Sequence, residues 1–253
     1  MIDTHCHLNI APLEENITDV IHDAQQAGVT RIIVPGVSVQ TSQSAALLQA
    51  KHTGVFAAAG IHPHEAGEWG GDVQGIERLL DQFSSIVAVG EIGLDYLRSD
   101  GSETKQLDLF RMQLELARKY AKPVIIHTRD AFEETINILA EYSQLSILIH
   151  SFSGTTEQAA KLLDAGYLLS LNGIMTFRKN EQLRQTVGSL PLDRLVLETD
   201  APYLSPEGFR GKSNEPCRLL QIARCLAEVK KLTVEVIDEM TTATAVQFFN
   251  LPE

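Results

Sequence analysis

The chain begins with Met1-Ile2-Asp3-Thr4-His5-Cys6-His7, which we interpret as a first strand that ends in two histidines. Side chains on a strand alternate between its two faces, so His5 and His7 point the same way and Cys6 points the other way. Two imidazoles on one face, beside Asp3, make half of a metal site. The other ligands must then stand at the ends of other strands.

Short apolar, β-branched runs recur along the chain, and helical patterns follow them. Each run is nearly continuous in hydrophobicity, as in a parallel strand that is buried on both faces. The predicted strands span residues 2–7, 31–35, 55–60, 86–90, 123–127, 146–150, 168–171 and 195–199. The predicted helices span residues 13–27, 41–51, 76–83, 105–120, 131–142, 156–165, 181–189, 216–229 and 234–249.

Eight such strand–helix units in 253 residues have the size of one α/β domain of the TIM-type (β/α)8 barrel class. We therefore expect residues 1–253 to form a single barrel domain. An open, doubly wound sheet is the structural alternative. It is disfavoured because no glycine-rich nucleotide fingerprint follows the first strand.

The composition is that of an ordinary globular protein, with 44% hydrophobic and 21% charged residues. No apolar run approaches the roughly 20 residues of a membrane span, and no basic-then-apolar leader precedes the first strand. The three cysteines form no Cys-X-X-Cys pair, and we expect them to be reduced thiols. Together these features predict a cytoplasmic protein with no membrane association.

The formal net charge is −12. A protein that depends on a broad phosphate-binding surface is normally basic. Any phosphate-bearing substrate must therefore be held locally, by metal ions and a few cationic side chains. The alternative explanation of the charge is that it only keeps the protein soluble.

Polar residues stand at the carboxyl ends of several predicted strands. In a barrel these ends converge, and active sites are built there from several strands. Imidazoles and carboxylates that converge in this way are the ligands of zinc, manganese and related ions. A lone histidine at a strand end is usually a hydrogen-bonded core or rim residue, but the joint pattern predicts a metal site. Besides His5 and His7, the set contains Glu91, His127, His150, Glu198 and Asp200.

Four segments strongly resemble the TatD-type metal-dependent hydrolases of the amidohydrolase-like superfamily. They are residues 3–7 (DTHCH), 89–95 (VGEIGLD), 150–154 (HSFSG) and 197–204 (LETDAPYL). The resemblance implies a TIM-type barrel, one to three divalent ions (often two; Zn, Mn or Mg) and deoxyribonuclease-type phosphodiester hydrolysis. It further implies that one ion is bound by His5, His7, Glu91 and Asp200, and that Glu91 bridges to a second ion held by His127 and His150.

Two ions about 3.5–4 Å apart can activate a water and stabilise the entering and leaving oxygens of a phosphoryl displacement. Asp200 is the candidate proton acceptor. Glu198 shares a strand face with Asp200, and we expect it to orient a ligand histidine rather than to bind metal; a salt bridge is the alternative. His62 is the first candidate, and His64 the second, for contact with the scissile phosphate or for protonation of the leaving group. The alternative is that both histidines only pack in the loop beside Pro63.

Cationic contacts with the substrate are predicted at Arg129 and Arg178, because arginine grips a phosphate with two hydrogen bonds. Arg210 and Lys212 are equally well explained as solvated loop cations. Two aromatic residues of the last loop, Tyr203 and Phe209, could stack a base, although packing beneath the loop is the simpler expectation.

The expected partner is DNA or a small phosphodiester, with no membrane and no obligate protein partner. An amidohydrolase or lactonase that cleaves a small C–N or C–O substrate at the same metal site is the first alternative function. A non-catalytic metal-binding scaffold is the second. It is disfavoured because a structural metal site closes its coordination with four ligands, whereas six candidates suggest open positions.

Overall fold

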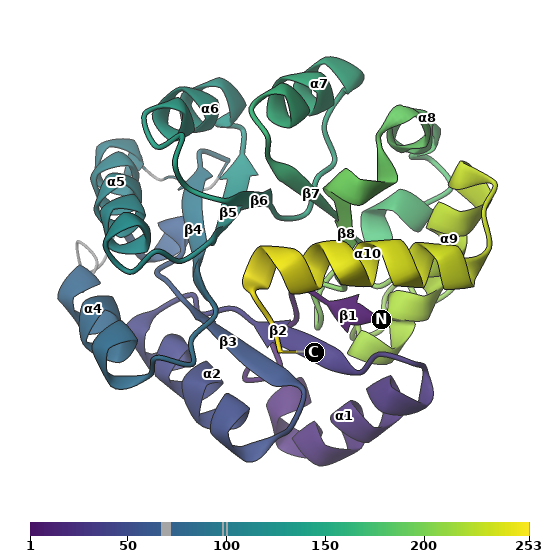
Figure 1. The fold of residues 1–253 in the computed structure, drawn as a ribbon, viewed down its shortest axis with the longest axis horizontal. Coiled ribbons are helices and arrows are strands. Elements are labelled where there is room, and N and C mark those ends of the chain that lie inside the picture. Colours follow the sequence, from purple (N-terminus) through teal and green to yellow (C-terminus); the bar gives the residue numbers. More distant parts are fainter. Residues whose placement is uncertain (67–71, 98, 100, 253) are drawn as a thin grey trace. The chain divides into compact units, whose positions relative to one another are not determined.

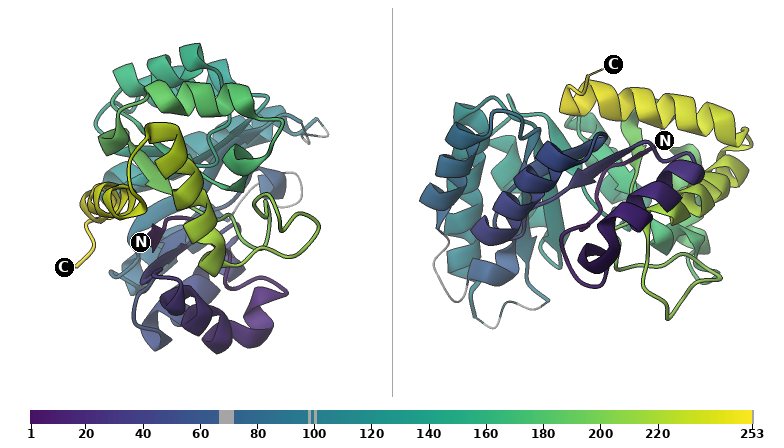
Figure 2. Two further views of the ribbon diagram at one scale, coloured as in Figure 1. Left: turned by 90° about the vertical axis from the view of Figure 1, so that its right-hand side faces the viewer. Right: turned by 90° about the horizontal axis from the view of Figure 1, so that it is seen from below.

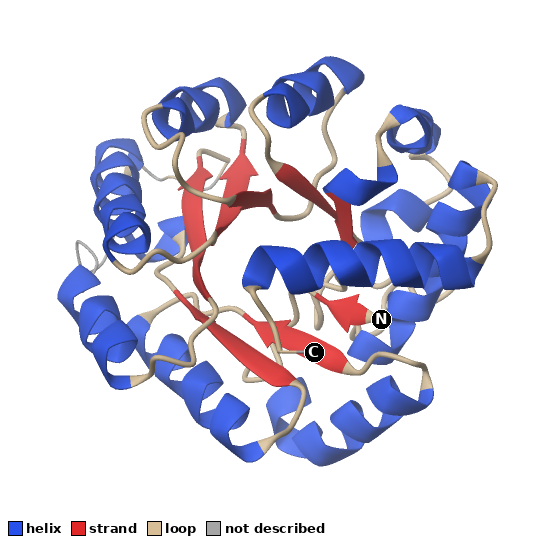
Figure 3. Ribbon diagram, viewed as in Figure 1, coloured by secondary structure: helices blue, strands red, loops and turns tan. Residues whose placement is uncertain are grey.

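The computed structural model describes residues 1–66, 72–97, 99 and 101–252 of the chain. It contains eight parallel strands whose spatial order follows the sequence, β1 to β8, with helices between successive strands (Figures 1 and 3). Sequential order and strand–helix alternation are the signature of the TIM-type (β/α)8 class, as predicted. Contacts divide the chain into unit 1, Met1–Val34 with Ser151–Glu253, and unit 2, Pro35–His150.

Unit 2 supplies the four middle strands of the order. Its helices α4, α5 and α6 lie on the outer side of its strands β4 and β5 (Figure 1). Its strands are β3 Val55–Ala59, β4 Ala88–Asp95, β5 Val124–Arg129 and β6 Ile147–Ile149. Its helices are α2 Val39–Lys51, α4 Val73–Gln82, α5 Glu103–Lys119 and α6 Phe132–Ala140, with the 3-10 turn η2 Pro63–Glu65.

Strand β4 is longer than predicted, because it continues past Gly90 to Asp95. Its register on β5 shifts by one residue between Val89 and Ile92, so β4 carries a bulge at the point where the prediction ended it. A bulge bends a strand and re-aims its side chains without ending the pairing. Glu91 therefore projects from within a strand and not from a loop.

Unit 1 supplies the first two and last two strands. The strands are β1 Ile2–Asp3, β2 Arg31–Val34, β7 Leu168–Leu171 and β8 Leu195–Leu197. The helices are α1 Ile17–Gln26, α7 Thr156–Asp164, α8 Glu181–Ser189, α9 Leu219–Lys230 and α10 Val234–Phe249. Short 3-10 turns are η1 Leu13–Asn16, η3 Gly173–Thr176, η4 Leu192–Arg194 and η5 Pro216–Arg218.

Helix α10 covers the amino-terminal ends of β1 and β8 (Figure 1). The Met1 amino group forms an ion pair of 2.9 Å with Asp238 on α10. The loop that follows β8 lies at the opposite end of the unit (Figure 2, right). The carboxyl ends of β1 and β8 are thus left for the loops that carry His5, His7 and Asp200.

Two findings bear on the composition-based expectations. Cys6, Cys217 and Cys225 are all free, which confirms the prediction of unpaired thiols. Within the described part of the chain, no helix is both long and apolar enough to cross a membrane.

The close approach of β4 to β5 yields a testable prediction at Gly93. Its φ is +145°, and a Cβ atom there would lie 1.9 Å from the backbone oxygen of His127. We expect Gly93→Ala to lower the free energy of unfolding by about 2–4 kcal/mol, because neither backbone can yield cheaply. Urea unfolding followed by circular dichroism measures this.

The matched control is Gly188→Ala on α8, where the nearest heavy atom to the added Cβ is Val229 Cγ1 at 3.6 Å. Alanine is favoured over glycine in a helix by about 0.8–1 kcal/mol. This variant should unfold at the wild-type urea concentration or above it. Equal midpoints for the two variants would contradict the packing argument.

Candidate functional site

Three predicted ligands of unit 1 converge, and we call His5, His7 and Asp200 the unit 1 cluster. The Nε2 atoms of the two histidines lie 3.3 Å apart. Asp200 Oδ1 lies 3.8 Å from Nε2 of His5 and 3.5 Å from Nε2 of His7. Ligand atoms about 2.0–2.1 Å from one tetrahedral zinc ion are themselves about 3.3 Å apart, so this spacing fits a shared ion.

Backbone hydrogen bonds hold the unit 1 cluster together. The predicted first strand, residues 2–7, is wrong in length, since regular strand ends at Asp3. Its continuation nevertheless runs beside the segment after β8: Asp200 N–H donates to His5 O (2.8 Å), and His7 N–H donates to Ala201 O (2.8 Å). Asp200 itself has a φ of +56°, a left-handed conformation that aspartate tolerates better than most residues.

The buried side chain of Asp3 links these two segments through hydrogen bonds. It accepts hydrogen bonds from Thr199 Oγ1 (2.6 Å), from Thr199 N–H (2.9 Å) and from His5 N–H (3.3 Å). Burial raises the pKa of Asp3 to about 8, although the bonds from Thr199 oppose that rise. Asp3 therefore positions both ends of the cluster without belonging to it.

Glu198 is fully buried and lies at the end of β8. Its Oε1 accepts hydrogen bonds from Ser151 N–H (2.9 Å) and from Asn172 Nδ2 (3.1 Å), and Asn172 also donates to Ser151 Oγ (2.8 Å). The sequence reasoning missed Asn172, whose only signal was its place directly after a buried strand. The predicted role of Glu198, to orient a ligand histidine, stays a prediction.

In unit 2, three histidines surround one carboxylate oxygen, and we call His62, Glu91, His127 and His150 the unit 2 cluster. Glu91 Oε1 lies 2.9 Å from His127 Nδ1, 3.5 Å from His150 Nε2 and 3.6 Å from His62 Nε2. These distances again suit ligands that share an ion. His62, predicted to contact substrate, thus stands among the candidate metal ligands.

Asp95 is the residue of unit 2 that the sequence reasoning missed. Its Oδ2 lies 3.2 Å from His127 Nε2 and 2.9 Å from His64 Nε2, and its backbone is held on both sides by the Gln106 amide (2.9 and 3.0 Å). Burial would raise the pKa of Asp95, but the hydrogen bonds from His127 and His64 hold it well below its usual range. The signal was present, because Asp95 follows Glu91 by four on one strand and so shares its face.

The two carboxylates define the chemistry of His127. Its Nδ1 faces Glu91 while its Nε2 faces Asp95. A metal-ligating histidine usually donates its other ring N–H to a carboxylate, which fixes the tautomer. This arrangement would present Nδ1 of His127 to an ion and leave Nε2 to Asp95. Burial would lower the pKa of His127, but its bonds to Asp95 and Glu91 raise it overall; burial lowers that of His62 to about 3.

The arginines predicted to contact substrate are more exposed to solvent than the residues of the two clusters. Arg129 is exposed, and the Arg178 side chain is 91% exposed with Glu207 3.9 Å away. Phe209 does pack, under the guanidinium of Arg218 at 4.7 Å. For Tyr203 the packing expectation was wrong: it is 53% exposed, with its ring 5.9 Å from that of His7.

Comparison with known proteins gives a consistent result. Residues 2–250 match the family model described as TatD related DNase. A "3'-5' ssDNA/RNA exonuclease TatD" from Erwinia billingiae is 33% identical, with all of both chains covered. The "Uncharacterized metal-dependent hydrolase YabD" of Bacillus subtilis is 34% identical over 99% of each chain.

A solved structure is also similar. The TatD homolog YJJV of Escherichia coli superposes with a TM-score of 0.94 at 31% identity, over 100% of this chain and 98% of that one. An overlap of this extent confirms the fold class that the strand order indicates.

The contact of Asp95 with His127 can be tested by substitution. We expect Asp95→Ala to weaken metal binding or hydrolytic activity by about 10–100-fold, as loss of the partner of a ligand histidine typically does. Titration of the metal-free protein with Mn²⁺ or Zn²⁺ measures the affinity. Asp108→Ala, at an exposed position on α5, is the matched control and should bind as the wild type does. An unchanged affinity and activity in Asp95→Ala would refute the positioning role.

Proposed function

This chain belongs to the family of TatD-related DNases and is a metal-dependent phosphodiester hydrolase. From this premise we propose that it removes nucleotides from the 3′ end of single-stranded DNA or RNA. The direction and the single-stranded substrate are those in the name of the Erwinia billingiae relative. The observation that carries the metal-dependent chemistry is the pair of clusters, in each of which imidazole nitrogens surround a carboxylate oxygen.

We assign one ion to each cluster. His5, His7 and Asp200 would hold the first, and Glu91, His127 and His150 would hold the second. Divalent ions polarise a phosphoryl oxygen and lower the pKa of a bound water to near neutrality. Mixed histidine and carboxylate ligands suit zinc and manganese, and magnesium remains a candidate. That Glu91 bridges the two ions stays a prediction from the family resemblance.

The protein's own side chains have separate tasks in this proposal. Asp200 presents one oxygen to the cluster and is the proposed acceptor of the proton from the attacking water. His62, which lies against Glu91, is proposed to contact the scissile phosphate. His64 is the second candidate for this contact. Arg129 and Arg178, both exposed, are free to follow a flexible strand.

Tyr203 is a proposed stacking platform for a base. Its ring is exposed and stands edge-on to His7, a member of the unit 1 cluster. Stacking on an aromatic ring tolerates any base, because every base has a π-face. Such a contact suits a protein whose net charge of −12 excludes a broad phosphate-binding surface.

Metal removal and replacement test the proposal. Dialysis against a chelator should abolish hydrolysis of single-stranded DNA, and added Mn²⁺, Mg²⁺ or Zn²⁺ should restore it. We expect Glu91→Gln to lower kcat/KM by at least about 100-fold and to lower the metal content found by elemental analysis. Glu228→Gln, at an exposed position on α9, should change neither.

End-labelled strands determine the direction of cleavage. A 3′-labelled strand should release labelled mononucleotide at once, whereas a 5′-labelled strand should shorten in a ladder. Release of labelled mononucleotide from the 5′ end would reverse the proposed polarity. Hydrolysis of lactones or amides with none of phosphodiesters would refute the nuclease proposal itself.

A further inference from the structure

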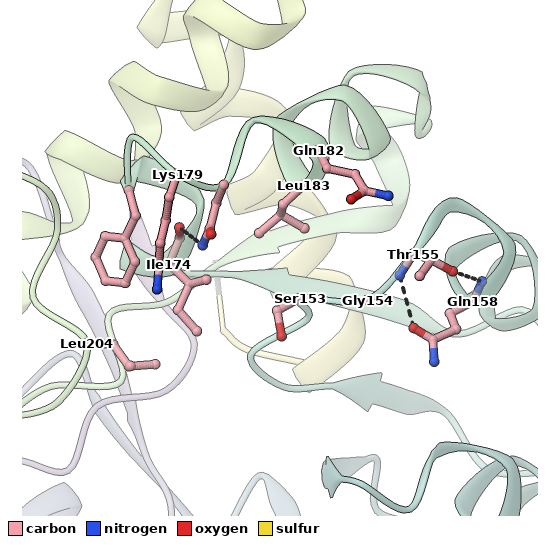
Figure 4. Close-up of a pocket in the computed structure, with 11 residues that line it drawn as sticks. Ser153, Gly154, Thr155, Gln158, Ile174, Lys179, Gln182, Leu183 and Leu204 are labelled. Atoms are coloured by element: carbon pink, nitrogen blue, oxygen red, sulfur yellow. Dashed lines mark hydrogen bonds between the residues drawn. The ribbon is translucent and has the colours of Figure 1, made fainter.

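A cavity of about 580 Å³ lies within unit 1 (Figure 4). Its walls come from the loop after β6 and the start of α7, from the segment between β7 and α8 with the start of α8, and from the loop after β8. The lining residues are Ser153, Gly154, Thr155, Gln158, Ile174, Phe177, Lys179, Asn180, Gln182, Leu183 and Leu204. Its volume is in the usual range for a small-molecule site, about 300–1,000 Å³.

The cavity shares a wall with the loop that carries Asp200. Tyr203 N–H donates to Asp200 O at 2.8 Å, and the next residue, Leu204, lines the cavity. Gly173 fixes this wall, because a Cβ atom there would lie 1.9 Å from Leu204 O. The proposed stacking residue, Tyr203, and one lining residue of the cavity, Leu204, are thus neighbours in the same loop.

The chemistry of the lining is unusual for so acidic a protein. The chain has 33 acidic and 21 basic residues, yet none of the eleven described lining residues carries a carboxylate, and one is a lysine. A second cation adjoins the cavity, since the Arg210 guanidinium lies 4.3 Å above the ring of Phe177. The described lining therefore presents no carboxylate of its own to repel a phosphate.

The lining also has the two kinds of surface that a nucleotide presents. Ile174, Leu183 and Leu204 offer apolar contact for the face of a base. Gln182 and the Nε2 atom of Gln158, with the nearby hydroxyl of Ser153, offer donors and acceptors for its edge. The Oε1 atom of Gln158 already accepts from Thr155 N–H at 2.9 Å (Figure 4). Lys179, on the same rim as Ile174, can pair with a phosphate.

We propose that this cavity binds one nucleotide of a single-stranded polynucleotide, upstream of the nucleotide that is cleaved. The inference rests on the proposed function and adds a subsite to it. Only strands that are long enough to reach the cavity gain affinity from this subsite. The base lies against the apolar wall, and its phosphate pairs with Lys179. Substrates that are too short to reach the cavity then bind more weakly, with a higher KM, while kcat is unchanged.

The experiment compares an oligothymidylate with bis(p-nitrophenyl) phosphate, a phosphodiester too small to span both sites. Lys179→Ala removes the cation, and Ser153→Trp fills the cavity from an exposed position. Both should raise KM for the oligonucleotide by about tenfold, the order of one lost base contact, and leave kcat/KM for the small phosphodiester unchanged. Lys179→Ala should also reduce the slope of log(kcat/KM) against log[salt] by about 0.7, the value for one phosphate on a single strand.

Two control variants carry the same replacements elsewhere. Lys51→Ala and Ser143→Trp alter exposed residues that do not line the cavity, and both should hydrolyse the oligonucleotide as the wild type does. An unchanged KM and salt slope in both cavity variants would overturn the subsite. So would an equal loss on both substrates, which would mean that the residues support the catalytic site. Failure of the wild type itself to cleave the oligonucleotide, with the small phosphodiester still hydrolysed, would refute the proposed function instead.

Discussion

The hydrogen bonds between Asp3 and Thr199 are the interaction on which unit 1 depends. They join residues 196 positions apart, and they place the segment after β1 beside the segment after β8. Regular strand structure has already ended at this point, and the pairing continues as a bridge between Cys6 and Ala201 with backbone hydrogen bonds from Asp200 and His7. A buried carboxylate with three donors reinforces these backbone bonds and orients both segments at once.

In unit 2, a strand bulge positions the candidate ligands. A bulge in β4 turns Glu91 toward His127 and lets the strand continue far enough to bring Asp95 to the other nitrogen of that ring. One imidazole is thus held between two carboxylates from a single strand. The Gln106 amide in turn fixes the backbone at Asp95, so a helix anchors the outer partner of the histidine.

The acidic composition does not set the charge at every site of the protein. The described groups that could hold a metal ion combine carboxylates with histidines, and the described residues that line the cavity of unit 1 carry no carboxylate. In the proposed function, affinity for the strand comes from local contacts, namely stacking on Tyr203 and pairing with single cations. A site of this kind would favour flexible single strands, whose bases can turn out of line to reach it.

The sequence by itself determined the fold class and the types of side chain in the candidate metal groups. Eight apolar runs in alternation with helical patterns allow few other architectures, and a polar residue after a buried strand needs a partner or an ion. It also placed His5 and His7 on one face, because the two-residue period of a strand is local. The tertiary structure alone decided the length of β1 and β4, the pairing of His127 with Asp95, the hydrogen bonds of Asn172 to Glu198, and the exposure of Tyr203. Each of these depends on contacts between segments distant in sequence, or on burial by them, and no local pattern encodes such a contact.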